Sequence, residues 1–303
     1  MTLHDAFLVL KGNLEPSPTH ISSIERRHNA VRSVIENKIS HAKTQLIGSL
    51  QRQTRISPLN DDKFDIDILV ELGSFSSWGP NGVTPDMASS SVHGILEESD
   101  RYSQMDPFVD HPTVSLSYSD DVSVELVPAY RDLVGHSPTG ISHQPTGRAF
   151  WVPDGNTWKL ADYDHEAAII TTCNTLCEGK FIPTVKMLKD LKRKYFSNLG
   201  SFHLETLAAH TLPSIYTAAK NNGAILSYPE MITAFFSQSS ALLDQQIRMP
   251  GSVSPHISLD PTHISVTQKA FDVLSRYCSS QPTGSYAQQR SHWREIFTDT
   301  FPA

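Results

Sequence analysis

The stretch Phe64-Asp65-Ile66-Asp67-Ile68-Leu69-Val70 decides the fold of this chain, because two acidic residues interrupt an apolar run at alternate positions. A β-strand points successive side chains to opposite faces, so Asp65 and Asp67 project from one face, roughly 7 Å apart along the chain. Ile66 and Ile68 then point into a core on the other face. Two carboxylates held together among apolar neighbours repel each other unless a cation lies between them. The pattern therefore predicts a site for a hard divalent ion with oxygen ligands, most simply Mg²⁺.

A third carboxylate is expected from a hairpin further along the chain. Apolar runs over 113–118 and 122–127 are joined by a short polar turn, which is typical of two antiparallel strands. In the second strand, Glu125 points away from its immediate apolar neighbours, so it reaches the site of Asp65 and Asp67 if the two strands are adjacent. Three carboxylates on adjacent strands can hold two divalent ions. One activates an attacking hydroxyl, and the other binds a triphosphate and stabilises the leaving pyrophosphate.

Two other groupings of ligand-type residues are weaker candidates. Asp120 and Asp121 could supply the third acid, but their place in the turn is typical of solvated residues. Cys173 and Cys177 lie four residues apart on an expected helix, two turns after His165, which is part of a zinc-ligand pattern. A fourth ligand is not apparent from the sequence, and cysteines at this spacing commonly pack in a core. The Asp65, Asp67 and Glu125 grouping is therefore preferred.

Upstream of the two aspartates, an apolar stretch ends in Gly48-Ser49. Glycine lets the backbone approach a phosphate closely, and serine offers both an N–H and a hydroxyl donor. If a helix begins just after this turn, its N-terminus adds a favourable dipole for an anion. Gly48 and Ser49 are therefore expected to bind a phosphate group.

Length and composition fit a globular protein with one large domain or two lobes. The chain has 303 residues, of which 39% are hydrophobic and 19% charged, and its formal net charge is −7. No apolar run approaches the roughly 20 residues that span a bilayer, and no block of Lys and Arg marks a nucleic-acid-binding face. We expect no membrane and no stable DNA or RNA partner. Three cysteines are too few for a disulfide framework, and the N-terminus shows no secretion signal, so we expect a cytoplasmic protein.

The order of the elements predicts an α+β fold in two lobes. Residues 1–155 contain the strands and a long amphipathic helix over 18–42, which Ser17 caps and Pro18 starts. Residues 156–303 are mostly helical, with expected helices over 164–178, 182–196, 202–219, 228–246, 263–279 and 287–297. The first lobe is completed by a short strand over 45–47, a strand over 64–72, a short helix over 87–96 and a loop-rich segment over 132–162.

These residues carry a family resemblance. Gly48-Ser49, then Asp65-Ile66-Asp67 after fifteen residues, then Val124-Glu125-Leu126-Val127-Pro128-Ala129, resembles the DNA-polymerase-β-type nucleotidyltransferases. Within them the chain resembles the cGAS/DncV-like nucleotidyltransferases (CD-NTases) of bacterial CBASS anti-phage systems. The resemblance implies a nucleotidyltransferase lobe with a mixed or antiparallel sheet and a long N-terminal spine helix. It also implies a C-terminal helical lobe and an active site in the cleft between the two.

The same resemblance assigns residues in the helical lobe. Val185-Lys186-Met187-Leu188-Lys189-Asp190-Leu191 is similar to the helix that presents a lysine to the triphosphate. Gly200-Ser201-Phe202-His203-Leu204-Glu205 is similar to the segment whose serine contacts the same group. On that match Lys189 and Ser201 carry over as triphosphate ligands, and Lys186 is the alternative lysine.

Two departures from the family pattern concern the metal site. The interval before the first aspartate is long, so 57–63 must form an extra loop. The third acid is Glu125 where Asp is more usual, and Glu reaches about one methylene further. Neither departure removes a required group, so Asp65, Asp67 and Glu125 are still expected to bind two Mg²⁺ ions, for which Mn²⁺ could substitute.

The resemblance implies that the enzyme joins nucleoside triphosphates into a cyclic di- or trinucleotide. In the bacterial cytoplasm this second messenger would act on a downstream effector in anti-phage defence, with CBASS regulatory proteins as partners. Two alternatives are an enzyme that makes linear oligonucleotides or modifies an RNA or protein acceptor, and an inactive nucleotide-binding module.

Overall fold

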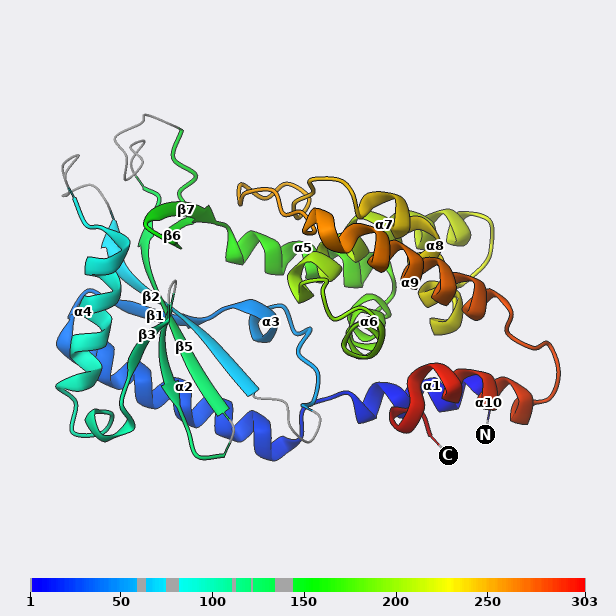
Figure 1. Cartoon of the computed structure of the whole chain (residues 1–303), viewed down its shortest axis with the longest axis horizontal. Helices are drawn as coiled ribbons and strands as arrows, with labels where there is room; N and C mark the ends of the chain where they lie inside the picture. Colours follow the sequence, from blue (N-terminus) through cyan, green and yellow to red (C-terminus); the bar gives the residue numbers. More distant parts are fainter. Residues whose placement is uncertain are drawn as a thin grey trace.

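The computed structural model describes residues 2–58, 64–74, 82–110, 113–120, 122–133 and 144–302 of the chain. A β-sheet with its covering helices occupies one end of an elongated molecule, and a group of packed helices occupies the other (Figure 1). The α+β fold class is therefore confirmed. Among the described residues, no helix is both long and apolar enough to cross a membrane.

The described residues form one sheet of seven strands in the order β1-β2-β5-β4-β3, with β6 paired to β5 and β7 to β6. The strands are β1 (Lys43–Leu46), β2 (Phe64–Ser74), β3 (Phe108–Asp110), β4 (Thr113–Ser117), β5 (Val122–Arg131), β6 (Phe150–Asp154) and β7 (Thr157–Ala161). All neighbouring pairs are antiparallel except β2 and β5, which run parallel. The predicted β4–β5 hairpin and the mixed sheet are confirmed.

The pairing of β2 with β5 brings the three predicted carboxylates to one face of the sheet. Asp67 lies opposite Glu125 in the register, and Asp65 lies opposite Ser123. The side chain of Ile66, between the two aspartates, is fully buried on the other face. The period-2 pattern of the sequence thus separates an apolar face from an acidic one.

Strand β5 continues beyond its predicted end at residue 127, although Pro128 lacks an N–H. On the edge away from β2, pairing with β4 ends at Leu126 and pairing with β6 begins at Tyr130. Pro128 falls in the gap between these two partners, where a missing N–H breaks no ladder.

The segment expected to be loop-rich contains the β6–β7 hairpin, which the sequence did not predict. Its turn contains Gly155, whose φ of +58° lies in the left-handed region that favours glycine. Pro153 lies inside β6, but β5 pairs only with the first two residues of that strand, so Pro153 faces a single partner strand. Gly155 and Pro153 therefore belong to a hairpin, although glycine and proline in this segment suggested an irregular loop.

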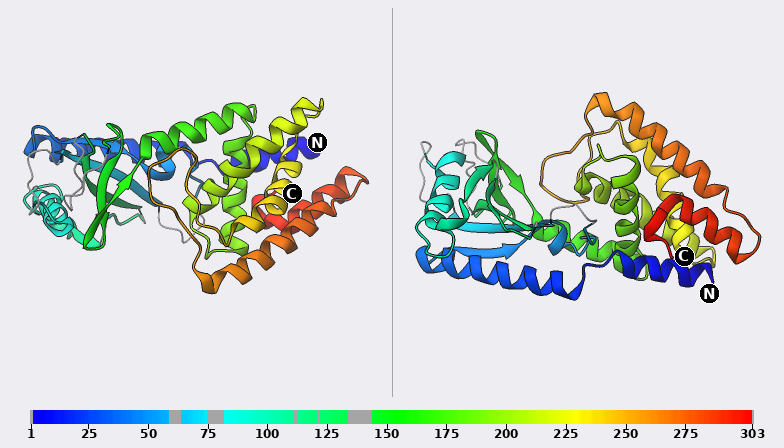
Figure 2. Two further views of the ribbon diagram at one scale, coloured as in Figure 1. Left: turned by 90° about the horizontal axis from the view of Figure 1, so that it is seen from above. Right: turned by 60° about the horizontal axis from the view of Figure 1, so that its bottom comes forward.

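Two helices cover the apolar face of the sheet. Helix α2 (Pro18–Lys38) runs along the sheet, as Figure 2 shows, and α4 (Pro85–Glu97) packs beside it. Ser17 caps α2 by accepting a hydrogen bond from the His20 N–H at 3.2 Å, and Pro18 is the first helical residue, as predicted. The helix ends at Lys38, four residues before its predicted end, and a turn leads into β1.

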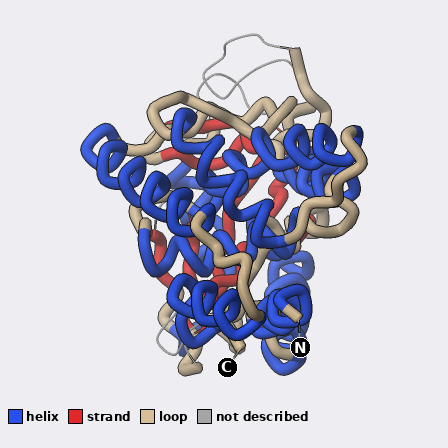
Figure 3. Tube along the Cα trace, turned by 90° about the vertical axis from the view of Figure 1, so that its right-hand side faces the viewer, coloured by secondary structure: helices blue, strands red, loops and turns tan. Residues whose placement is uncertain are grey.

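The remaining helices pack around a second core (Figure 3). They are α1 (Leu3–Asn13), α5 (Tyr163–Leu176), α6 (Phe181–Tyr195), α7 (Ser201–Asn221), α8 (Tyr228–Ser239), α9 (Pro261–Ser279) and α10 (Tyr286–Phe297). Short 3-10 turns follow α4, α8 and α10 at Ser103–Met105, Ser240–Leu242 and Thr298–Thr300. A single helical turn, α3 (Gly48–Gln51), stands between β1 and β2.

Helix α1 was not predicted, and it belongs to this second core although it begins the chain. Phe7 packs edge-on against Trp293 and Phe301, with ring centroids 5.1 and 5.2 Å apart. The two ends of the chain consequently lie close together (Figure 1). The division into two lobes at residue 155 stays a proposal. In that division, α1 packs on the second lobe, although it precedes α2, which packs on the first.

Candidate active site

The Gly48–Ser49 turn is built directly against the acidic face of the sheet. Gly48 has φ +67°, and a Cβ atom on it would lie 2.4 Å from Asp67 Oδ2. The Ile47 N–H also donates to the Asp67 carbonyl at 3.0 Å. Only glycine satisfies both the left-handed backbone and the close approach. The helix that follows is a single turn, so its dipole adds less for an anion than the sequence suggested.

The three carboxylates share a partly buried, mutually repulsive environment. Ser123 donates a hydrogen bond to Asp65 Oδ1 at 2.5 Å, which fixes that side chain. Burial raises the pKa of Asp67, with Asp65 adding to the rise and Arg55 opposing it. Burial together with the charges of Asp67 and Asp65 raises the pKa of Glu125 to about 7. A nearby cation would therefore stabilise the ionised forms of Asp67 and Glu125.

This donor set fits a hard divalent ion. Carboxylate oxygens are the ligands that Mg²⁺ and Mn²⁺ prefer, and a cation would relieve the repulsion that raises the pKa of Glu125. In the described ranges, no three His, Cys, Asp or Glu side chains are already close enough to hold an ion.

The alternative metal ligands are engaged elsewhere. Asp120 accepts both of its hydrogen bonds from Arg27 at 2.7 Å, and these lower its pKa. Asp121 lies outside the described residues, as does most of the extra loop expected over 57–63. Cys173 and Cys177 are buried in the helical core, and burial raises the pKa of their thiols to about 11 and about 12. They are packing residues with no thiolate character at neutral pH.

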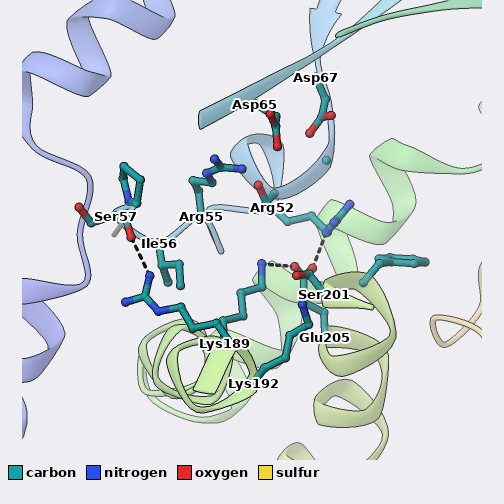
Figure 4. Close-up of a pocket in the computed structure, with 15 residues that line it drawn as sticks. Arg52, Arg55, Ile56, Ser57, Asp65, Asp67, Lys189, Lys192, Ser201 and Glu205 are labelled. Carbon is teal, nitrogen blue, oxygen red and sulfur yellow. Dashed lines mark hydrogen bonds and ion pairs between the residues drawn. The ribbon is translucent and has the colours of Figure 1, made fainter. Parts of the chain in front are cut away.

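A cavity of about 610 Å³ opens between the acidic strand and the helices α6 and α7. Figure 4 shows Asp65 and Asp67 on one side of it, with lysines of α6 and the first turn of α7 on the other. The lining residues are Gly48, Ser49, Arg52, Arg55, Ile56, Ser57, Pro58, Asp65, Asp67, Lys189, Lys192, Arg193, Ser201, Phe202 and Glu205. Six of the seven residues predicted for the site are in this set. The seventh, Glu125, lies just beyond it, opposite Asp67.

Lys189 lines the cavity, but its ammonium group is already held. Nζ pairs with Glu205 Oε1 at 2.5 Å and donates to the Thr54 carbonyl at 3.0 Å and its hydroxyl at 3.1 Å. Only 5% of the residue is exposed. Lys186, the alternative lysine, pairs with Glu15 at 2.6 Å and lines a different cavity.

Two other groups are better placed to meet an anion that enters the cavity. Lys192 follows Lys189 by three residues on α6, and no described residue is its hydrogen-bond or ion-pair partner. Burial lowers its pKa, as expected of a partly desolvated cation without a counter-ion. Ser201 is exposed at the first position of α7, a 21-residue helix whose positive end therefore borders the cavity.

Sequence reasoning missed Arg52, Lys192 and Glu205. Glu205 ends the stretch 200–205 that carries the family resemblance, and Arg52 follows the Gly48–Ser49 turn by three residues. One usable signal was spacing: Glu205 follows Ser201 by four residues, so the two share a helix face. The other was an acid between two leucines, Leu204 and Leu207, which requires a charged partner when it is buried.

The sheet is mixed and carries acidic residues on one face, the Gly-Ser turn lies against that face, and the helical half of the molecule lies beyond the turn. This arrangement is a polymerase-β-like nucleotidyltransferase fold. The chain belongs to the family described as the Second Messenger Oligonucleotide or Dinucleotide Synthetase (SMODS) domain, which matches residues 1–162 of its 303. The resemblance to CD-NTases is thereby confirmed.

Individual relatives agree with this assignment. A cyclic AMP-AMP-AMP synthase from an Acinetobacter strain is 25% identical over 222 residues, which make up 69% of this chain and 58% of that protein. The match thus spans less than two thirds of that relative's length. CdnC from E. coli MS115-1, solved with ATP, superposes with a TM-score of 0.66 at 16% identity and 99% coverage of both chains. CdnG from Bradyrhizobium diazoefficiens, solved with GTP, gives 0.69 at 13% identity, covering 97% of this chain and 94% of that one. At such identities the structures establish the shared fold.

Proposed function

We propose that this chain is a metal-dependent nucleotidyltransferase that joins nucleoside triphosphates into a cyclic di- or trinucleotide. One observation carries the proposal: Asp65 and Asp67, with Glu125 opposite, face a cavity beside the Gly48–Ser49 turn. Acidic groups on one wall and cationic groups on the other suit a magnesium-bound triphosphate. The SMODS assignment supports the same class of product.

The reaction would be an in-line displacement at the α-phosphorus of one nucleotide by the 3′- or 2′-hydroxyl of another, with pyrophosphate leaving. Asp65, Asp67 and Glu125 would hold two Mg²⁺ ions, for which Mn²⁺ could substitute. Bound there, the ions would acidify the attacking hydroxyl and neutralise charge on the leaving group. Glu125 would help to deprotonate the attacking hydroxyl from its place opposite Asp67.

The triphosphate would lie between the Gly-Ser turn and the helices. Gly48 permits close approach of the backbone, and Ser49 offers its N–H and hydroxyl. Lys192 and Ser201 would bind the terminal phosphates from the helical side. We assign Lys189, predicted for this role from the sequence, to support of the turn, because its ammonium already has three partners.

We extend the proposal to a second-messenger role in anti-phage defence, with a downstream effector that responds to the cyclic product. A CdnC:HORMA-ΔN complex from E. coli MS115-1 is among the structural neighbours. It supports a search for a regulatory partner of this chain as well.

The test is incubation of purified protein with radiolabelled ATP, GTP, CTP and UTP, singly and together, with Mg²⁺ or Mn²⁺, followed by phosphatase. A product that resists phosphatase has no terminal phosphate and is expected for a cyclase. A phosphatase-sensitive ladder would instead identify a maker of linear oligonucleotides. Absence of product with and without infected-cell lysate, together with nucleotide binding, would identify an inactive binding module. The D65A/D67A double variant is the control for chemistry at this site.

A further inference from the structure

Glu205 on α7 is the centre of a buried ion network beneath the candidate active site. Its Oε1 pairs with Lys189 Nζ at 2.5 Å and accepts from the Thr54 hydroxyl at 2.8 Å. Its Oε2 accepts from Arg52 Nε at 2.5 Å. Figure 4 shows the bonds from Arg52 and Lys189 converging on this carboxylate. Glu205 is fully buried, and Arg52 is only 7% exposed.

The network joins the sheet-containing half of the molecule to the helical half. Arg52 and Thr54 follow the Gly48–Ser49 turn, whereas Glu205 and Lys189 come from α7 and α6. The turn is closed by its own backbone, because the N–H groups of Thr54 and Arg55 both donate to the Ser49 carbonyl, at 2.9 and 3.2 Å. One end of segment 48–55 is therefore set by the contact with Asp67, and the other by Glu205.

The charge of Glu205 is needed, and not only its hydrogen-bonding capacity. Among the described residues it is the only carboxylate that forms an ion pair with Lys189 or Arg52, whereas Glu166 and Asp67 act on Arg52 without pairing with it. Arg52 is further confined by stacking over the Phe202 ring at 4.8 Å. A neutral amide in place of the carboxylate would leave these two buried cations without their ion-pair partner.

We propose that Glu205 is a positioning residue that fixes the Gly48–Ser49 turn beside the paired carboxylates, acting through Arg52, Thr54 and Lys189. This inference rests on the proposed nucleotidyltransferase function, because it gives the turn its task of holding a triphosphate. This role is more than structural. The geometry of the turn, and therefore the rate of the chemical step, would depend on one side chain from the helical half of the molecule.

The first experiment is E205Q, with E178Q as the matched control. Glu178 also pairs with a lysine, Lys220 at 2.5 Å, but at an exposed position outside the cavity. In pyrophosphate-release assays with the four nucleoside triphosphates and Mg²⁺, we expect E205Q to lower kcat on the order of 10- to 100-fold, because small displacements of a positioning group carry such costs. KM should change less than kcat. E178Q should match the wild type.

The second measurement does not depend on activity. Hydrogen exchange of the Thr54 and Arg55 amides reports whether the turn is closed. We expect faster exchange at these amides in E205Q, with α7 still protected. If the wild type shows no turnover with any nucleotide, with or without infected-cell lysate, the proposed function fails, and this exchange result alone decides whether Glu205 positions the turn.

The double variant K189M/E205Q separates charge balance from direct contact with phosphate. Removing the second buried cation should restore slow exchange at the Thr54 and Arg55 amides and part of the lost kcat. A KM raised tenfold or more in K189M alone would make Lys189 a triphosphate ligand and overturn its place in the proposal. Unchanged kcat and unchanged amide exchange in folded E205Q would overturn the proposal as a whole.

Discussion

Gly48 and Asp67 approach so closely that a methyl group on the glycine would lie 2.4 Å from Asp67 Oδ2. The glycine also has φ +67°, so an alanine there would be strained as well as crowded. The turn that is expected to hold the triphosphate and the carboxylate that is expected to hold the metal are therefore fitted to each other. A side chain at position 48 would displace Asp67 or the turn itself.

We predict that G48A abolishes measurable nucleotide turnover, because the added methyl must push Asp67 or the turn aside. The free energy of unfolding should fall by about 1–3 kcal/mol, the usual cost of a strained left-handed residue. Product formation and urea denaturation measure the two effects. G12A is the matched control, since Gly12 lies in α1 with nothing within 4 Å of a new Cβ. It should be active and slightly more stable than the wild type.

The elements that build this contact could be predicted from the sequence because each depends on local pattern. Alternation of apolar and acidic residues over 64–70 gives a strand with two faces, and the 3.6-residue period gives most of the helices within a few residues. The position of Glu125 needed only the assumption that its strand neighbours β2. The structure shows that pairing, with Asp67 opposite Glu125.

The partner of each lysine could not be predicted, because it depends on contacts between distant segments. Thr54 and Glu205, which together hold Lys189, are 151 residues apart in sequence. Lys189 and Lys192 look equivalent in a basic helix segment, and only the packing of α6 against the turn distinguishes them. Helix α1 was missed for a similar reason, since Phe7 is ordered by Trp293 and Phe301 at the other end of the chain.

We predict that K192A weakens binding of nucleoside triphosphates, because it removes a cation that has no partner of its own among the described residues. Loss of one charge-assisted contact of about 1.5–3 kcal/mol corresponds to a KM raised roughly 10-fold or more. Initial rates across a range of nucleotide concentrations give the value. K269A, an exposed lysine change on α9, should leave KM unaltered. Equal KM values for K192A and the wild type would exclude Lys192 as a phosphate ligand.

The free energy of unfolding should depend on pH in a way that reveals the ion network around Glu205. Burial alone would raise the pKa of Glu205, but Arg52 and Lys189 outweigh it and lower the pKa to about 2. An ordinary glutamate in the unfolded chain titrates near 4.5. The network's contribution is therefore fully present above about pH 4.5 and is lost as the pH falls from there toward about 2.

Urea denaturation of the wild type and E205Q at several pH values tests this expectation. The variant should be about 3–5 kcal/mol less stable at pH 7 and at pH 5, since it leaves buried cations without their anion. The gap should narrow at pH 3.5. For E178Q, whose ion pair is exposed, the gap should be small at each pH. A gap for E205Q that stays constant down to pH 3.5 would show that Glu205 has no lowered pKa.

On the acidic face, we expect a substitution that removes function to increase stability, whereas E205Q should lower both. Burial raises the pKa of Asp67 and Asp65 raises it further, so the metal-free protein is destabilised by the charges that its proposed chemistry needs. We predict that D67N, which keeps the shape and removes one charge, increases the thermal midpoint of the metal-free protein at pH 8. The same variant should lose turnover and most of the stabilisation that Mg²⁺ or Mn²⁺ gives the wild type.

Melting curves with EDTA and with each metal measure both halves of this prediction. Asp120, already neutralised by Arg27 at 2.7 Å, provides the control D120N, which should lower the midpoint slightly and leave the metal response intact. A D67N protein that melts higher than the wild type in EDTA and no longer responds to metal would show two things. Asp67 is repelled by the neighbouring carboxylates in the metal-free protein, and it helps to bind the cation. A D67N protein that melts lower than the wild type in EDTA would instead mean that Arg55 and the surrounding cations already compensate the aspartates before any ion binds.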